Sequence, residues 1–108
     1  MRALYVEDHE VFARMAIARW LGGYQVCHVT TVRKALALVT EPFDLVLVDF
    51  DLPDGKGDAV VRALRARHPT LRILGVSSHD EGNASLRRAG ATAVCRKDAF
   101  DALPSLLG

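Results

Sequence analysis

The chain has 108 residues, 50% of them apolar and 25% charged, which fits one compact domain around a single hydrophobic core. Fourteen Lys and Arg residues face thirteen Asp and Glu residues, and the basic residues are spread along the chain instead of clustered. The sequence therefore gives no sign of a basic surface that would bind a polyanion, and we do not expect direct binding to nucleic acid. We predict one domain over residues 1–108, with no room for a second.

The apolar runs are short, which limits where the protein can reside. None approaches the ~20 residues of a membrane span, and the first run, residues 3–6, is followed at once by Glu7 and Asp8. We therefore expect a cytoplasmic protein that does not enter a membrane. Cys27 and Cys95 lack the spacing of metal ligands, and an intracellular chain would keep both reduced.

Short apolar runs alternate with segments of helical period along the chain. The predicted strands are residues 3–6, 25–29, 45–48, 73–76 and 93–95, and the predicted helices are residues 11–21, 32–39, 58–67, 83–89 and 102–107. Gly22 and Gly23 end the first helix, and Thr31 can cap the second. Residues 45–48 are apolar at every position, as in a central strand buried on both faces. This order predicts an α/β fold, a parallel sheet with helices on both faces.

The first predicted helix is apolar around nearly its whole circumference. Val11, Met15 and Trp20 belong to this apolar set, whereas Arg14 and Arg19 are the only charged residues beyond the first turn. Two interpretations stay open. The helix is either covered tightly on all sides, or it leaves part of its apolar surface outside for a partner.

Chemically active side chains follow four of the predicted strands. Glu7 and Asp8 follow the first, Asp49 and Asp51 the third, Ser77 and Ser78 the fourth, and Lys97 the fifth. Each of these residues alone fits an ordinary helix start, strand end or surface charge. In a doubly wound sheet, however, the loops at the carboxyl ends of the strands gather around one crevice. Their joint placement therefore predicts a single site.

Carboxylates that converge in this way repel one another unless a cation compensates. Their oxygens are hard ligands, with no His or Cys among them, so Mg²⁺ is the favoured ion. The Asp49 carboxylate can then attack phosphorus and form an aspartyl phosphate. Mg²⁺, the Lys97 ammonium and the Ser77 hydroxyl would neutralise the equatorial oxygens of the transferring phosphoryl group.

Four motifs occur in order along the whole chain. They are Glu7-Asp8, LVLVDFDLPDGKG at residues 45–57, GVSS at residues 75–78 and GATAVCRKD at residues 90–98. Together they resemble the four signatures of response-regulator receiver domains. The resemblance implies a doubly wound five-stranded parallel sheet in the order 2-1-3-4-5, with Cys27 and Cys95 on opposite edge strands. LRARHP and the KDA ending are most similar to receivers of the NarL/LuxR type, here as a stand-alone receiver without an output domain.

The resemblance also implies roles for individual residues. It matches Asp49 with the phosphoacceptor, Glu7 and Asp8 with the acidic pair that holds Mg²⁺, and Asp51 with a residue whose backbone carbonyl binds the metal. It matches Ser77 with the switch hydroxyl and Lys97 with the lysine that pairs with the phosphate. Asp51 and His79 match positions that control the lifetime of the phosphate. The implied phosphodonor is a phosphohistidine on a sensor histidine kinase or phosphotransfer protein, and the downstream target is a protein. Such a chain is a signalling phosphoacceptor and not an enzyme, because it catalyses only its own phosphorylation and dephosphorylation.

Three departures from the family pattern concern the output face. Val94 occupies the position of an aromatic residue that moves with the switch hydroxyl. We expect a shortened fourth helix of about two turns. We also expect a short last helix that Asp101 caps, with Pro104 in its first turn and its end at Gly108. The reduced face predicts a monomer.

Two alternative functions remain. VDFDLPDG also resembles the nucleophile motif of haloacid dehalogenase phosphatases, although 48 residues precede Asp49 here and Glu7 and Asp8 would then have no role. The second alternative is a receiver-like interaction module that works without phosphorylation.

Overall fold

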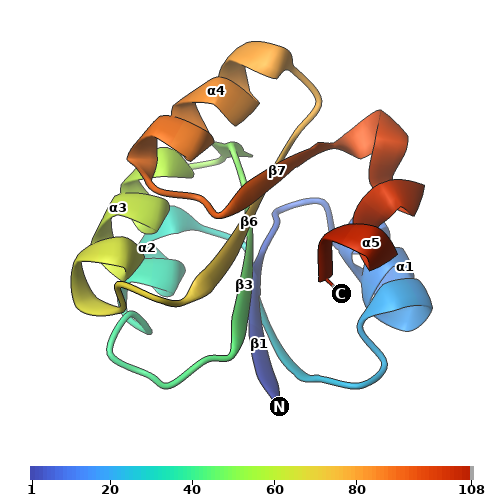
Figure 1. Cartoon of the computed structure of the whole chain (residues 1–108), viewed down its shortest axis with the longest axis horizontal. Coiled ribbons are helices and arrows are strands. Elements are labelled where there is room, and N and C mark those ends of the chain that lie inside the picture. Colours follow the sequence, from blue (N-terminus) through green and yellow to red (C-terminus); the bar gives the residue numbers. More distant parts are fainter. Residues whose placement is uncertain (108) are drawn as a thin grey trace.

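The computed structural model describes residues 1–107, although not the side chains of Ala102 and Leu107. Within that range the largest sheet has five parallel strands in the order β2-β1-β3-β6-β7 (Figure 1). These strands are β1 (Arg2–Val6), β2 (Gln25–Val29), β3 (Leu45–Asp49), β6 (Arg72–Ser77) and β7 (Ala93–Arg96). Counted along the chain, this is the predicted order 2-1-3-4-5, which is therefore confirmed.

Helices cover both faces of this sheet. They are α1 (Glu10–Trp20), α2 (Val32–Leu36), α3 (Asp58–Arg67), α4 (Asp80–Ala89), the 3₁₀ helix η1 (Lys97–Ala102) and α5 (Leu103–Leu107). Figure 1 shows α1 and α5 on one side, and α2, α3 and α4 on the other. Successive side chains of a strand point to opposite faces, so Leu4 lies in the core under α2 to α4, whereas Tyr5 lies in the core under α1 and α5. Strand β3 is buried at every position, as predicted.

Two helices differ from their predicted bounds. α4 begins at Asp80, three residues earlier than predicted, and its ten residues make it longer than the two turns expected. Asp80 and Glu81 favour this earlier start, because acidic side chains are stabilised in the first turn of a helix. α2 ends earlier, at Leu36, and Thr31 caps it as predicted.

The segment after β7 also differs. Asp101 lies inside η1 and is not a helix cap, whereas Pro104 does lie in the first turn of α5. α5 has five residues, as short as predicted, and its relation to Gly108 lies outside the described residues.

The first helix keeps part of its apolar surface exposed. Ala13 and Ala16 are buried, but Val11 is 66% exposed and Met15 37%. Cys27 and Cys95 are unpaired thiols on the two edge strands, β2 and β7. No helix among residues 1–107 is long and apolar enough to cross a membrane.

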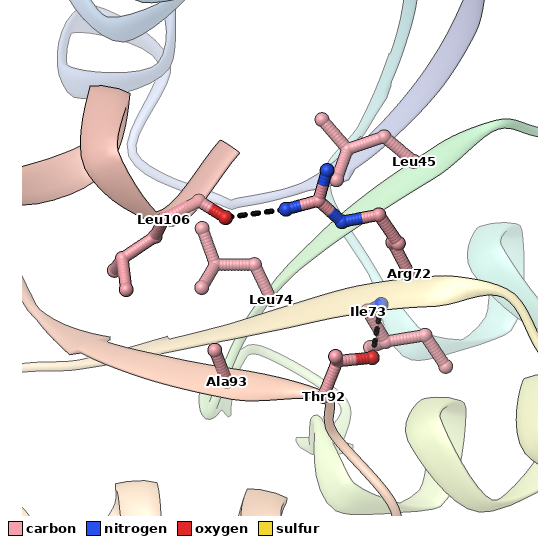
Figure 2. Close-up of a pocket in the computed structure, with 7 residues that line it drawn as sticks. All are labelled: Leu45, Arg72, Ile73, Leu74, Thr92, Ala93 and Leu106. Atoms are coloured by element: carbon pink, nitrogen blue, oxygen red, sulfur yellow. Dashed lines mark hydrogen bonds between the residues drawn. The ribbon is translucent and has the colours of Figure 1, made fainter. Parts of the chain in front are cut away.

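A small cavity lies at the amino ends of β3, β6 and β7, next to α5 (Figure 2). Its volume is about 20 Å³, and Leu45, Arg72, Ile73, Leu74, Thr92, Ala93 and Leu106 line it. Arg72 closes one side by donating to the backbone carbonyl of Leu106. A cavity of this volume holds about one water molecule. It lies at the end of the sheet opposite the carboxylates of the predicted site, and no predicted site residue lines it.

Candidate functional site

The predicted site residues lie together at the carboxyl end of the sheet. Glu7 and Asp8 follow β1, Asp49 ends β3, Ser77 ends β6 and Lys97 follows β7. Carboxylate oxygens of Glu7, Asp8 and Asp49 all lie within 4.8 Å of one another. Glu7 and Asp49 are buried, whereas Asp8 is exposed and gives the cluster an open side. Parallel strands bring these residues together because their carboxyl ends share one edge of the fold.

Lys97 provides the positive charge of the cluster. Its Nζ lies 2.8 Å from Oε1 of Glu7 and 3.4 Å from Oδ2 of Asp49. The same Nζ lies 5.0 Å from the centre of the Phe12 ring on α1, close enough for a cation–π contact. Phe12 in turn stacks on Phe100 of η1, with the ring centres 5.1 Å apart. The ammonium is therefore held between two carboxylates and an aromatic ring.

Burial and neighbouring charges change the pKa values of Asp49 and Lys97. Burial and the neighbouring Glu7 raise the pKa of Asp49 from 3.8 to about 7, against the opposing effect of Lys97. Burial lowers the pKa of Lys97, but its contacts with Glu7 and Asp49 outweigh burial and leave this pKa raised. Without a bound cation, Asp49 is therefore partly protonated near neutral pH.

Ser77 lies beneath the first turn of α4. Its hydroxyl accepts a hydrogen bond from the His79 backbone N–H at 3.1 Å. In the sheet Asp49 is paired with Val76, the residue before Ser77. A Cβ atom at Gly82 would lie 2.4 Å from the Ser77 hydroxyl and 2.9 Å from the Phe50 ring, so a larger residue would displace these side chains. Ser77, Phe50 and α4 thus share one tightly packed contact.

The loop after Asp49 folds into a hairpin that the sequence analysis did not predict. Strands β4 (Asp51–Leu52) and β5 (Gly55–Lys56) pair in antiparallel fashion. Asp51 is exposed, and its carboxylate contacts Nζ of Lys56 at 2.6 Å instead of joining the carboxylate cluster. Its predicted contribution through the backbone carbonyl is compatible with this arrangement. A Cβ atom at Gly57 would lie 2.0 Å from the Asp49 carbonyl oxygen, so glycine is required where the hairpin returns.

The donor set of the cluster fits a hard divalent cation. Three carboxylates converge, one of them with no exposed surface, and no His or Cys side chain belongs to the group. Carboxylate oxygens with an open side suit Mg²⁺, which keeps several water ligands. Burial and the repulsion from Glu7, which together raise the pKa of Asp49, oppose its ionised form, and such a cation would stabilise that form.

Sequence reasoning missed two aromatic residues at the site. Phe12 contacts Lys97, and Phe50 packs beside Gly82 and lies 5.2 Å from Nζ of Lys56. Phe12 carries no polar group and stands among other apolar residues of α1, so the sequence does not distinguish it from a core residue. Phe50 had a clearer signal, because it directly follows the acceptor strand. Val94 is half-buried, with no ring at that position.

Comparison with known families agrees with this geometry. Residues 3–103 match the response regulator receiver domain family. The chain belongs to that family. Membership contradicts the haloacid dehalogenase alternative. The receiver domain is the phosphoacceptor part of two-component signalling systems.

Several relatives illustrate the similarity. The chain is 37% identical over 82 residues to the sensor protein TorS of Escherichia coli and 40% identical over 86 residues to the transcriptional activator protein ExaE of Pseudomonas putida. These matches cover 73% and 75% of the chain, but only 9% and 40% of the two relatives. The chain thus spans less than half of either protein.

Two solved structures share the fold at 26% identity and a TM-score of 0.85. One is a CheY-like receiver domain protein from Methanospirillum hungatei, with 98% of this chain and 90% of that chain covered. The other is a response regulator from Burkholderia pseudomallei, crystallised with a phosphorylated aspartic acid, a calcium ion and citrate, with 99% and 66% covered.

Proposed function

We propose that this chain is a phosphoacceptor receiver that takes a phosphoryl group on Asp49 in a Mg²⁺-dependent reaction. The phosphodonor is a phosphohistidine of a sensor histidine kinase or phosphotransfer protein. One observation carries the proposal. The buried Asp49 carboxylate lies within 4.8 Å of Glu7 and Asp8, and 3.4 Å from the Lys97 ammonium. This arrangement supplies a nucleophile, a cation site and a positive charge at one place.

The reaction needs few groups beyond these. An oxygen of Asp49 forms a bond to phosphorus while the bond from phosphorus to the donor imidazole nitrogen breaks, and that nitrogen keeps the electron pair. Lys97 pairs with one phosphoryl oxygen, and the Ser77 hydroxyl donates to another. Mg²⁺, held by Glu7, Asp8, Asp49 and the carbonyl of Asp51, would neutralise the charge that accumulates between carboxylate and phosphate.

Before the reaction, Lys97 also neutralises part of the negative charge of the carboxylates. Its ammonium contacts Glu7 and Asp49, and so offsets part of their repulsion. A divalent cation would take over that neutralisation. Lys97 then becomes available to the phosphoryl group, which links cation binding to the position of this side chain.

The comparisons support the proposal at the level of the family. The Burkholderia response regulator was crystallised with a phosphorylated aspartic acid and a divalent ion, and TorS is a sensor protein. We further propose the LuxR type, because a LuxR-family response regulator from Aurantimonas is 26% identical with a TM-score of 0.77. The chain would act as a single receiver domain over residues 1–108.

Mass spectrometry of the intact protein tests this function. Incubation with a small phosphodonor should add one phosphate when Mg²⁺ is present and none when it is chelated. Asp49→Asn should abolish the addition, because an amide is not a nucleophile. Asp44→Asn is the matched control, since Asp44 lies at the amino end of β3. Equal labelling of the Asp49→Asn protein would contradict the assignment, and Mg²⁺ binding without labelling would favour the phosphorylation-independent module.

A further inference from the structure

The β4–β5 hairpin is too small to hold its own shape. It consists of two residue pairs, Asp51 with Lys56 and Leu52 with Gly55. An isolated two-stranded hairpin is at best marginally stable in water, even when it is longer. The ion pair between Asp51 and Lys56 is exposed and contributes little. Other contacts must therefore fix the segment that carries Asp51.

Two such contacts come from Asp54, at the tip of the hairpin. Its Oδ1 accepts a hydrogen bond from the Val32 backbone N–H at 2.8 Å, and its Oδ2 accepts one from the Arg33 backbone N–H at 2.9 Å. These two N–H groups begin α2 and are 22 and 21 residues away in sequence. The two hydrogen bonds also lower the pKa of Asp54, so the carboxylate stays charged.

The start of α2, to which Asp54 binds, is itself packed in the core. Val32 and Ala35 of α2 are buried in the same cluster as Leu52 of the hairpin. Thr31 satisfies the next free N–H of the helix, that of Lys34, at 3.1 Å. Asp54 therefore completes the cap of α2, and in return α2 holds the tip of the hairpin three residues from Asp51.

We propose that Asp54 is a positioning residue of the cation site, which fixes the Asp51 backbone by binding the start of α2. The inference rests on the proposed function, in which the Asp51 carbonyl is a ligand of Mg²⁺. The side chain of Asp51 contacts Lys56 and lies outside the carboxylate cluster, so the proposed ligand is its backbone carbonyl. A ligand on a loose loop must be ordered when the cation binds, and that ordering weakens affinity.

Calorimetric titration with Mg²⁺ alone measures the effect directly. Asp54→Ala should weaken Mg²⁺ binding about 10-fold, a usual result of removing a residue that orients a ligand. Asp54→Asn keeps one accepting oxygen and should bind with intermediate affinity. Asp44→Ala is the matched control. Asp44 is also an exposed aspartate that accepts from a distant backbone N–H, that of Arg2 at 2.8 Å, but it does so at the amino end of the sheet. Its affinity for Mg²⁺ should stay at the wild-type value.

Amide hydrogen exchange provides a second measurement, at the start of α2. The Val32 and Arg33 amides should lose protection in Asp54→Ala. Mg²⁺ should increase their protection in the wild-type protein, because cation binding and the Asp54 contact are coupled, but not in Asp54→Ala, which lacks the connecting hydrogen bonds.

The possible outcomes separate the inference from the proposed function. Wild-type affinity in both Asp54 variants would overturn the inference alone, and so would equal weakening in Asp44→Ala, because a general loss of stability would then explain the effect. If Asp54→Ala does not fold, Asp54→Asn decides by the same comparison. Absence of Mg²⁺ binding in the wild-type protein would overturn the proposed function and the inference with it.

Discussion

Lys97 places its ammonium 2.8 Å from the carboxylate of Glu7, a residue with no exposed surface. A buried charge that loses its partner is strongly destabilising. We expect Lys97→Met to lower the free energy of unfolding of the metal-free protein by about 3 kcal/mol, as measured in urea. Mg²⁺ should recover most of this loss, because a cation can replace the ammonium beside Glu7 and Asp49. A variant as stable as wild type without Mg²⁺ would show that this ion pair is not needed.

The raised pKa of Asp49 predicts a pH-dependent stability of the metal-free protein. The folded chain keeps this proton up to about pH 7, whereas an ordinary Asp loses it near 3.8. Between these values the folded state binds more protons than the unfolded state, so stability falls as pH rises through this window. Since 1 kcal/mol moves the Tm of such a domain by about 4–8 °C, Asp49→Asn should raise Tm by several degrees at neutral pH in the presence of a chelator.

Two comparisons make that experiment specific. Asp44→Asn removes a carboxylate outside the site and should leave the pH dependence of Tm unchanged. Saturating Mg²⁺ should flatten the wild-type dependence, because a bound cation keeps Asp49 ionised. A wild-type Tm that is constant from about pH 5 to pH 8 in chelator would contradict the raised pKa of Asp49.

Gly82 offers a test of the contact between Ser77 and α4. Its substitution by Ala would place a Cβ atom 2.4 Å from the Ser77 hydroxyl. We expect Gly82→Ala to cost about 1–3 kcal/mol through overpacking and to slow phosphorylation by displacing Ser77. Gly22→Ala is the control, because a Cβ atom at Gly22 meets nothing within 4 Å. Similar phosphorylation rates in the two variants would mean that α4 does not constrain the hydroxyl.

Asp51 and His79 lead to a prediction about the lifetime of the phosphorylated state. Both are exposed and lie two residues beyond Asp49 and Ser77, respectively. Asp51→Asn also frees Lys56, whose Nζ now contacts the Asp51 carboxylate at 2.6 Å. We expect Asp51→Asn or His79→Ala to change the dephosphorylation rate severalfold while Mg²⁺ affinity stays the same. Decay of the labelled protein, followed by mass spectrometry, provides the measurement, and unchanged decay in both variants would refute the hypothesis.

The sheet and the site could be predicted because both depend on local patterns. Buried strands such as residues 45–48 are apolar throughout. Parallel strands bring their carboxyl ends together independently of the conformation of the loops. Asp49 and Lys97 could therefore be placed together from sequence alone. The hairpin at Asp51–Lys56 could not, because strands of two residues have no period. The contact of Asp54 with α2 joins residues more than twenty positions apart, and no local pattern records it.

Gly57 also determines where a structural change can travel. The backbone there approaches the Asp49 carbonyl so closely that a Cβ atom would lie at 2.0 Å, and the Gly57 N–H donates to the Phe50 carbonyl at 2.7 Å. The backbone before α3 is therefore packed directly against the end of β3. If Asp49 is phosphorylated as proposed, we expect the resulting structural change to reach Ser77 and the start of α4, where a Cβ atom at Gly82 would meet the Ser77 hydroxyl and the Phe50 ring.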